Sequence, residues 1–227
     1  KTQTSDNAYV KGDLTYITSK VGGYMVKVNV VDNQKVSAGQ VLAEIDPTDY
    51  VSGVNQAKAK IAEIVAVQHE LEEKIKLAKE KINISKAEIT AAEATQRRAA
   101  NYLKRTEDLV NIGGISKSDY DKAVEDQIGQ AANVNVAKVK IREAEQNIHV
   151  LQAQRGTLQA SLSAAQANLA QAENNLKATQ LVAPRDGVVV SRKVREGEYV
   201  SVAKNLMVIA PETNLWIEAN LKETQLS

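Results

Sequence analysis

Residues Val54–Val110 read VNQAKAKIAEIVAVQHELEEKIKLAKEKINISKAEITAAEATQRRAANYLKRTEDLV. A register whose steps alternate between three and four residues runs through this stretch. It is apolar at thirteen of its seventeen positions, against 43% of the whole chain. An apolar repeat of 3.5 residues is the pattern of a helix in a left-handed coiled coil. The stretch therefore predicts a long helix whose apolar seam faces a partner helix.

The same register returns in the stretch Tyr120–Leu176, which is equal in length to the first. Its apolar positions are Val134, Ala137, Ile141, Ala144, Ile148, Leu151, Leu158, Leu162, Ala165, Leu169, Ala172 and Leu176. Three polar residues, Gln127, Gln130 and Arg155, break it. Two helices of equal length that fold back on each other at residues 113–116 would bury both seams, so we expect an antiparallel hairpin. At 1.5 Å per residue each arm of about 60 residues would be about 90 Å long.

The turn between the two stretches has the residues that end one helix and begin another. Gly113 and Gly114 can adopt the left-handed conformation that terminates the outgoing helix. Ser116, with Asp119 three residues later, is a typical start for the returning helix. Before the first stretch, Asp46 can cap a helix that begins at Pro47.

Two Val-rich segments of a different pattern flank the helical region. Aligning Gly23 with Gly187 without gaps gives eight identities in 25 positions. The identical pairs are Gly23 and Gly187, Val26 and Val190, Val30 and Val194, Val36 and Val200, Ser37 and Ser201, Leu42 and Leu206, Ile45 and Ile209, and Pro47 and Pro211. The alternating valines indicate strands with one buried face. Each half is too short to fold alone, so we expect the two to pair into one sandwich.

The predicted fold class is α+β and elongated. A long antiparallel coiled-coil hairpin is inserted into a split biotinyl/lipoyl-like β-sandwich, and the two chain ends form part of a β-barrel domain. The predicted boundaries are 1–15 for the first barrel part, 16–46 for the first sandwich half, 47–178 for the hairpin, 179–211 for the second half and 212–227 for the start of the last barrel segment.

Composition excludes several classes of function. The net charge is +1, from 29 basic and 28 acidic side chains, which argues against nucleic-acid binding by bulk charge. The chain has no cysteine and therefore no disulfide or thiolate metal site. No apolar run reaches the roughly 18 residues that a membrane-spanning helix needs. The first residues have neither the charged start nor the apolar run of a signal peptide.

Three passages resemble the membrane fusion protein family of periplasmic adaptors, which is also called HlyD-like. They are SDNAYVKGD at 5–13, VSAGQVLAEIDPTDY at 36–50 and LWIEANLKETQLS at 215–227. The first and last passages resemble in particular the EmrA type of multidrug efflux adaptor. Family members have an N-terminal membrane anchor and a complete β-barrel domain, and we expect the anchor and most of the barrel to lie outside this chain.

The resemblance implies an adaptor in the periplasm of a Gram-negative bacterium, anchored to the inner membrane. Its partners would be an inner-membrane major-facilitator transporter, a TolC-like outer-membrane channel and further copies of itself. No cofactor, metal or catalytic residue is implied. Adaptors of the family carry the signature Arg-x3-Leu-x6-Ser at the hairpin tip, and Arg105, Leu109 and Ser116 have these spacings. In the family such residues meet the helix ends of the channel.

A purely structural interpretation of the tip residues stands beside this one. Arg105 would form an ion pair with a neighbour such as Asp108, Leu109 would fill the last layer of the coiled coil, and Ser116 would cap a helix. Both interpretations can hold together.

Other functions remain as alternatives. The type I polypeptide secretion adaptors share the same architecture. A biotinyl or lipoyl carrier would need its modified lysine on the tight turn between the two halves, where this chain has the helical insert. Catalysis is not expected, because His69 and His149 lie on opposite arms and at different levels of the hairpin. A phosphate-binding glycine loop and a nucleophile elbow are also missing from the sequence.

Overall fold

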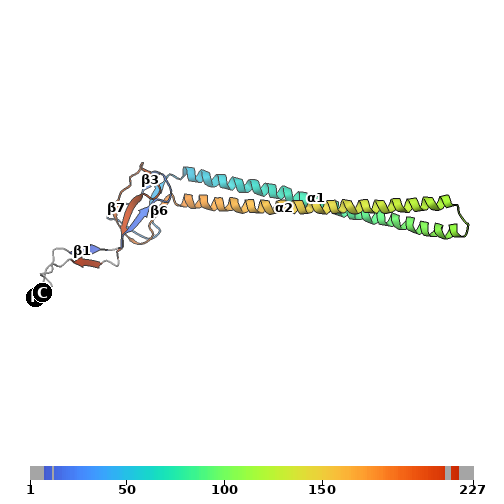
Figure 1. The fold of residues 1–227 in the computed structure, drawn as a ribbon. Helices are drawn as coiled ribbons and strands as arrows, with labels where there is room; N and C mark the ends of the chain where they lie inside the picture. The colour runs from blue at the N-terminus through green and yellow to red at the C-terminus, as the bar shows by residue number, and fades with distance from the viewer. Residues whose placement is uncertain (1–7, 12, 213–215, 220–227) are drawn as a thin grey trace, which may run out of the picture. The chain divides into compact units, whose positions relative to one another are not determined.

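The computed structural model describes residues 8–11, 13–212 and 216–219 of the chain (Figure 1). The predicted barrel parts, 1–15 and 212–227, lie largely outside the described residues. Within them, strands β1 (Ala8–Lys11) and β10 (Trp216–Ala219) pair in antiparallel fashion. The two chain ends therefore come together as one two-stranded sheet.

The chain divides into two units. One comprises residues 1–60 and 165–227 and contains all the described strands, and the other comprises residues 61–164 and contains the middle of both helices. The sandwich in the first unit consists of two four-stranded antiparallel sheets, ordered β2-β9-β7-β4 and β6-β5-β3-β8. Their strands are β2 (Thr15–Thr18), β3 (Gly23–Val28), β4 (Lys35–Val36), β5 (Val41–Ile45), β6 (Gln180–Val182), β7 (Gly187–Arg192), β8 (Tyr199–Val200) and β9 (Asn205–Ala210).

The sandwich has internal two-fold symmetry. A shift of 164 residues, the spacing between Gly23 and Gly187, maps β2, β3, β4 and β5 onto β6, β7, β8 and β9. Hydrogen bonds follow the same shift: Asn33 N–H donates to the Val189 carbonyl at 2.7 Å, and Gly197 N–H donates to the Met25 carbonyl at 2.8 Å. Each sheet therefore takes strands from both halves of the chain, which ties the halves into one structure.

The symmetry explains why glycine occurs at the first position of each repeat. A Cβ atom on Gly23 would lie 2.6 Å from Cγ2 of Ile45, and one on Gly187 would lie 2.6 Å from Cγ2 of Ile209. Real Cβ atoms do not approach neighbours this closely, so both positions need glycine. The two isoleucines fill the buried centre of the sandwich, beside Met25, Leu42, Val189, Val200, Leu206 and Met207.

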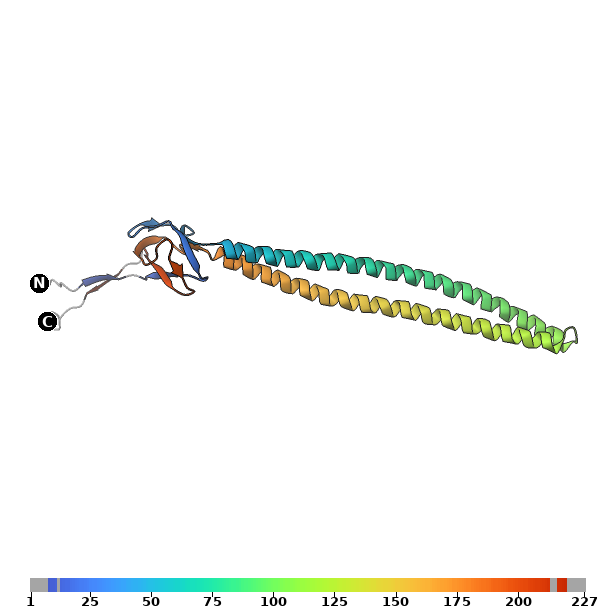
Figure 2. The same cartoon turned by 90° about the horizontal axis from the view of Figure 1, so that it is seen from above.

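Helix α1 (Thr48–Asn111) and helix α2 (Lys117–Lys177) are 64 and 61 residues long. In the second unit they run side by side, as Figure 2 shows. Ion pairs join them at Lys138 and Glu93, with 3.9 Å between charged atoms, and at Lys140 and Glu88, with 3.5 Å. These pairs match the alignment that a fold at residues 113–116 predicts.

The predicted register describes which side of α1 is buried. All seventeen positions from Val54 to Val110 are buried or half-buried in the structure. In α2 the two glutamines that interrupt the register are half-buried, whereas Arg155 is exposed. The predicted α+β fold class, with a coiled-coil hairpin inserted into a split β-sandwich, is confirmed.

The start of α1 is fixed by a short polar contact. The carboxylate of Asp46 accepts hydrogen bonds from the hydroxyl of Thr48 at 2.6 Å and from its N–H at 3.0 Å. These bonds favour the charged form and hold the pKa of Asp46 below its ordinary value. In the part of the chain that the structure describes, neither helix is apolar enough along its length to cross a bilayer.

Candidate partner-binding site at the hairpin tip

The end of α1 is a Schellman motif. The N–H of Gly114 donates to the carbonyl of Leu109 at 2.8 Å, and the N–H of Gly113 donates to that of Val110 at 3.1 Å. Gly113 has a φ of 75°, in the left-handed region that the motif needs and that glycine adopts without steric cost. These backbone hydrogen bonds end α1, and they fix the backbone of Leu109 next to the turn.

The beginning of α2 is capped by the side chain of Ser116. The N–H of Asp119 donates to the hydroxyl oxygen of Ser116 at 3.2 Å, and that hydroxyl donates to the Asp119 carboxylate at 2.7 Å. The Ser116 side chain therefore satisfies a backbone donor that the first turn of a helix otherwise leaves unpaired. This is the capping role that the structural interpretation of Ser116 predicts.

Leu109 does not fill the last layer of the coiled coil, as the structural interpretation had it. That layer is made by Thr106, which is 3% exposed, and by the half-buried Val110. Leu109 lies outside the register, and 43% of it is exposed. An exposed leucine beside a hydrogen-bonded turn is available to a partner.

Arg105 is also exposed, one helical turn before Leu109. Within the described residues it forms no ion pair with Asp108 or with any other carboxylate. Its guanidinium group therefore keeps all of its donors for solvent or for a partner.

Ile112 is a tip residue that the sequence pattern did not single out. It precedes Gly113 and is 79% exposed, more than any other large apolar side chain in the described part of the chain. The sequence signal that could have indicated it is a single apolar residue between the end of the first helix and the glycine of the turn. We call the exposed residues Arg105, Leu109 and Ile112 the tip surface.

The two histidines of the hairpin lie on different helices. His69 and His149 are both exposed. Across the described residues, no three His, Cys, Asp or Glu side chains gather closely enough to hold a metal ion. The chemistry of the tip surface is that of contact: an apolar patch beside a cation.

Comparison with protein families identifies the class of the molecule. The model of the barrel-sandwich hybrid domain of the RND membrane fusion proteins matches residues 14–211. These residues comprise both halves of the two-fold sandwich and the whole inserted hairpin. The chain therefore belongs to the membrane fusion protein family, whose members are adaptors rather than enzymes.

Within the family, the chain resembles the EmrA type. The colistin resistance protein EmrA of Acinetobacter baumannii (strain ATCC 17978) is 30% identical over 224 residues, which are 99% of this chain and 64% of that protein. The multidrug export protein EmrA of Escherichia coli K12 is 28% identical over 225 residues, again 99% of this chain and 55% of that protein. The chain thus spans about 55% to 64% of the length of these relatives.

A solved structure of the periplasmic adaptor protein EmrA has the same fold. It superposes with a TM-score of 0.57, covers 98% of this chain and is itself covered over 79% of its length, with 20% sequence identity. At this identity the likeness concerns the fold alone.

Proposed function

We propose that this chain is the central part of a periplasmic adaptor in a tripartite efflux pump. The adaptor joins an inner-membrane major-facilitator drug exporter to a TolC-like outer-membrane channel. The observation that carries the proposal is the tip surface, where Leu109 is exposed beside a turn that is closed by a Schellman motif and by the Ser116 cap. The names of the curated relatives, which describe colistin resistance and multidrug export, support drug export.

The proposed mechanism is passive. The tip surface packs between the helix ends of the channel, with Leu109 as the apolar anchor, Arg105 as a cation beside it and Ser116 at the start of the returning helix. Further copies of the chain assemble around the transport path, and an N-terminal anchor holds the full-length adaptor at the inner membrane. The inner-membrane transporter supplies the energy for transport.

Ser116 has a more indirect role in this mechanism than the signature implies. Its hydroxyl is engaged with Asp119, so it shapes the turn and does not offer a free donor to the channel. Arg105 and Leu109 have no such partner in the described part of the chain and would make the direct contacts.

The alternatives are less well supported. The connection between β5 and β6 is the helical hairpin, so the tight turn that would carry a modified lysine in a biotinyl or lipoyl carrier is replaced. A type I secretion adaptor has the same architecture, but the relatives named above are drug-export and drug-resistance proteins.

The substitution Leu109→Asp tests the proposal. Because Leu109 is exposed and outside the coiled-coil seam, aspartate there leaves the hairpin folded but places a charge in the apolar contact with the channel. We expect export to be lost in the native host while the helical circular dichroism of the purified protein stays unchanged.

The matched control is Leu77→Asp. Leu77 is also an exposed leucine of α1, at 71%, but it lies within the arm and away from the turn. We expect this variant to export normally. Normal export by Leu109→Asp would overturn the docking proposal.

A further inference from the structure

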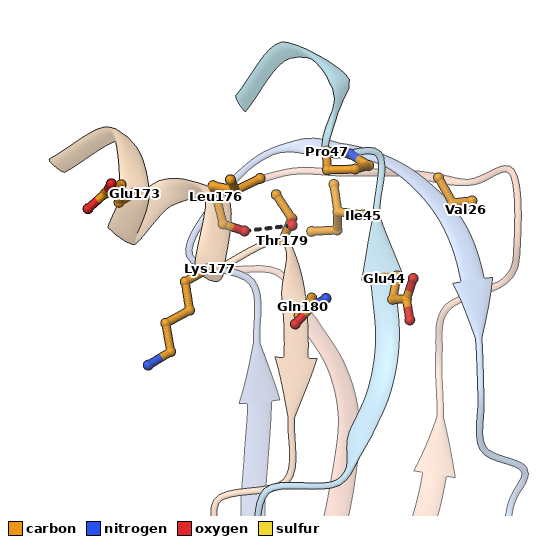
Figure 3. Close-up of a pocket in the computed structure, with 9 residues that line it drawn as sticks. All are labelled: Val26, Glu44, Ile45, Pro47, Glu173, Leu176, Lys177, Thr179 and Gln180. Atoms are coloured by element: carbon orange, nitrogen blue, oxygen red, sulfur yellow. Dashed lines mark hydrogen bonds between the residues drawn. The ribbon is translucent and has the colours of Figure 1, made fainter. Parts of the chain in front are cut away.

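A hollow of about 380 Å³ lies on the outer face of the sheet β6-β5-β3-β8, where the helices join the sandwich (Figure 3). Its size is within the range of small-molecule sites. Val26, Pro47 and Leu176 give it an apolar lining, and Glu44 and Glu173 supply carboxylates. Ile45 also borders the hollow, but its side chain belongs to the core of the sandwich. All of these residues belong to the first unit.

Two hydrogen bonds tie together the segments that form the rim of this hollow. The N–H of Ile45 donates to the carbonyl of Thr179 at 2.8 Å, which ties the strand before α1 to the segment after α2. The hydroxyl of Thr179 donates to the carbonyl of Leu176 at 2.7 Å, as the dashed line in Figure 3 marks. The apolar lining is therefore preformed, and a ligand would bind without ordering the chain.

The sandwich does not need the carboxylate of Glu44. The shift of 164 residues places Val208 at the equivalent position of β9, where it is 8% exposed. Glu44 is half-buried, and within the described residues it forms no ion pair. A half-buried carboxylate without a cation, at a site where the fold accepts valine, suggests a role in binding.

Two lysines near the hollow leave this carboxylate unpaired. Lys27 is opposite Glu44 in the neighbouring strand β3, yet no ion pair joins them. Lys177 is on the rim, and Figure 3 shows its side chain pointing away from Glu44. The carboxylates of Glu44 and Glu173 outnumber the one lysine that lines the hollow.

We propose that this hollow binds small amphipathic cations. The apolar body of the ligand packs on Val26, Pro47 and Leu176, and its positive charge faces the carboxylate of Glu44. The inference rests on the proposed efflux function in one respect: it names the class of compound that would be held at the base of the hairpin during export.

A pair of ions with the same shape and opposite charge tests the site. Tetraphenylphosphonium and tetraphenylborate both present four phenyl groups, so their difference in affinity measures the contribution of charge. Calorimetric titration of the purified chain should show tetraphenylphosphonium binding at least tenfold more tightly than tetraphenylborate. Glu44→Gln should lower the affinity for tetraphenylphosphonium about tenfold and should not lower the affinity for tetraphenylborate.

Two further variants control for folding and for general charge. Glu44→Val introduces the residue of the symmetry-related position, so it should keep the thermal midpoint of the wild type and lose the preference for the cation. Glu145→Gln removes an exposed carboxylate of α2 outside the hollow and should change neither affinity. Equal affinities for the two ions, an unaffected Glu44→Gln variant or no saturable binding would each overturn the proposal.

The outcome is independent of the test of the tip. Binding by the purified chain involves no channel. If the cation does not bind but Leu109→Asp abolishes export, only the inference about the hollow is removed. Charge-dependent binding together with normal export by Leu109→Asp would instead remove the docking proposal and keep the site.

Discussion

Gly113 shows how much of the tip depends on one residue. Its positive φ lets two N–H groups of the turn reach the last carbonyls of α1. A Cβ atom there would meet no neighbour within 4 Å, so the cost of replacing it is conformational and not steric. Gly113→Ala should lower the free energy of unfolding by about 1 kcal/mol, which thermal denaturation followed by circular dichroism would measure.

Gly129→Ala is the matched control for this prediction. Gly129 lies within α2 and also has open space around its missing Cβ atom, but its φ is not positive. Alanine in a helix interior is favoured over glycine by about 1 kcal/mol, so this variant should be more stable than the wild type. A Gly113→Ala variant that is equally stabilised would contradict the assignment of the Schellman motif.

Single residues at the tip were predicted from the sequence to different degrees. The glycines and Ser116 have local, recognisable capping roles, so their positions followed from helix-ending and helix-starting patterns. The exposure of Leu109 did not follow, because the register shows which residues are in the seam but not how the helix ends beside it. Ile112 was missed because a single apolar residue has no period.

The coiled-coil register is the main feature at the scale of elements. It places Ile75 in the seam, where it is 8% exposed, and Leu77 two residues away on the solvent side. Ile75→Ala removes buried methyl and methylene groups and should lower the free energy of unfolding by about 2 kcal/mol or more. The measurement is again thermal or denaturant unfolding of the purified chain.

Leu77→Ala controls for the general effect of shortening an apolar side chain in α1. Since Leu77 is largely exposed, its loss should change the free energy of unfolding by no more than about 0.5 kcal/mol. Equal losses in the two variants would show that the seam of the hairpin is assigned to the wrong face.

The arrangement of the strands was only partly predictable. The internal repeat and the alternating valines predicted two matching halves in one sandwich. They did not predict that β9 lies between β2 and β7, or that β5 lies between β6 and β3. Strand order between segments more than 150 residues apart depends on long-range pairing, and the local pattern is the same for every possible order.

At the scale of the whole molecule, the two-fold sandwich explains how a long hairpin can be inserted into a small β module. The strands of each sheet come from both halves, so the insertion between β5 and β6 interrupts the chain but not the hydrogen-bonded sheets. The family likewise comprises proteins with this sandwich, matched here over residues 14–211. The central proposal is that the tip of the hairpin contacts an outer-membrane channel.

A crosslink from the tip tests that proposal most directly. The chain has no cysteine, so a thiol can be placed at one position at a time. Asn111, the last residue of α1, is exposed and adjoins the tip surface, and replacing it leaves the hydroxyl cap of Ser116 intact. Ser163, exposed in the arm of α2, provides the control position.

The measurement is made in the native host with a short thiol crosslinker, and adducts are identified by mass spectrometry. The adaptor account predicts that Asn111→Cys forms an adduct with an outer-membrane channel and that Ser163→Cys does not. A folded, expressed Asn111→Cys protein that forms no adduct with a channel, or that forms the same adducts as Ser163→Cys, would contradict it.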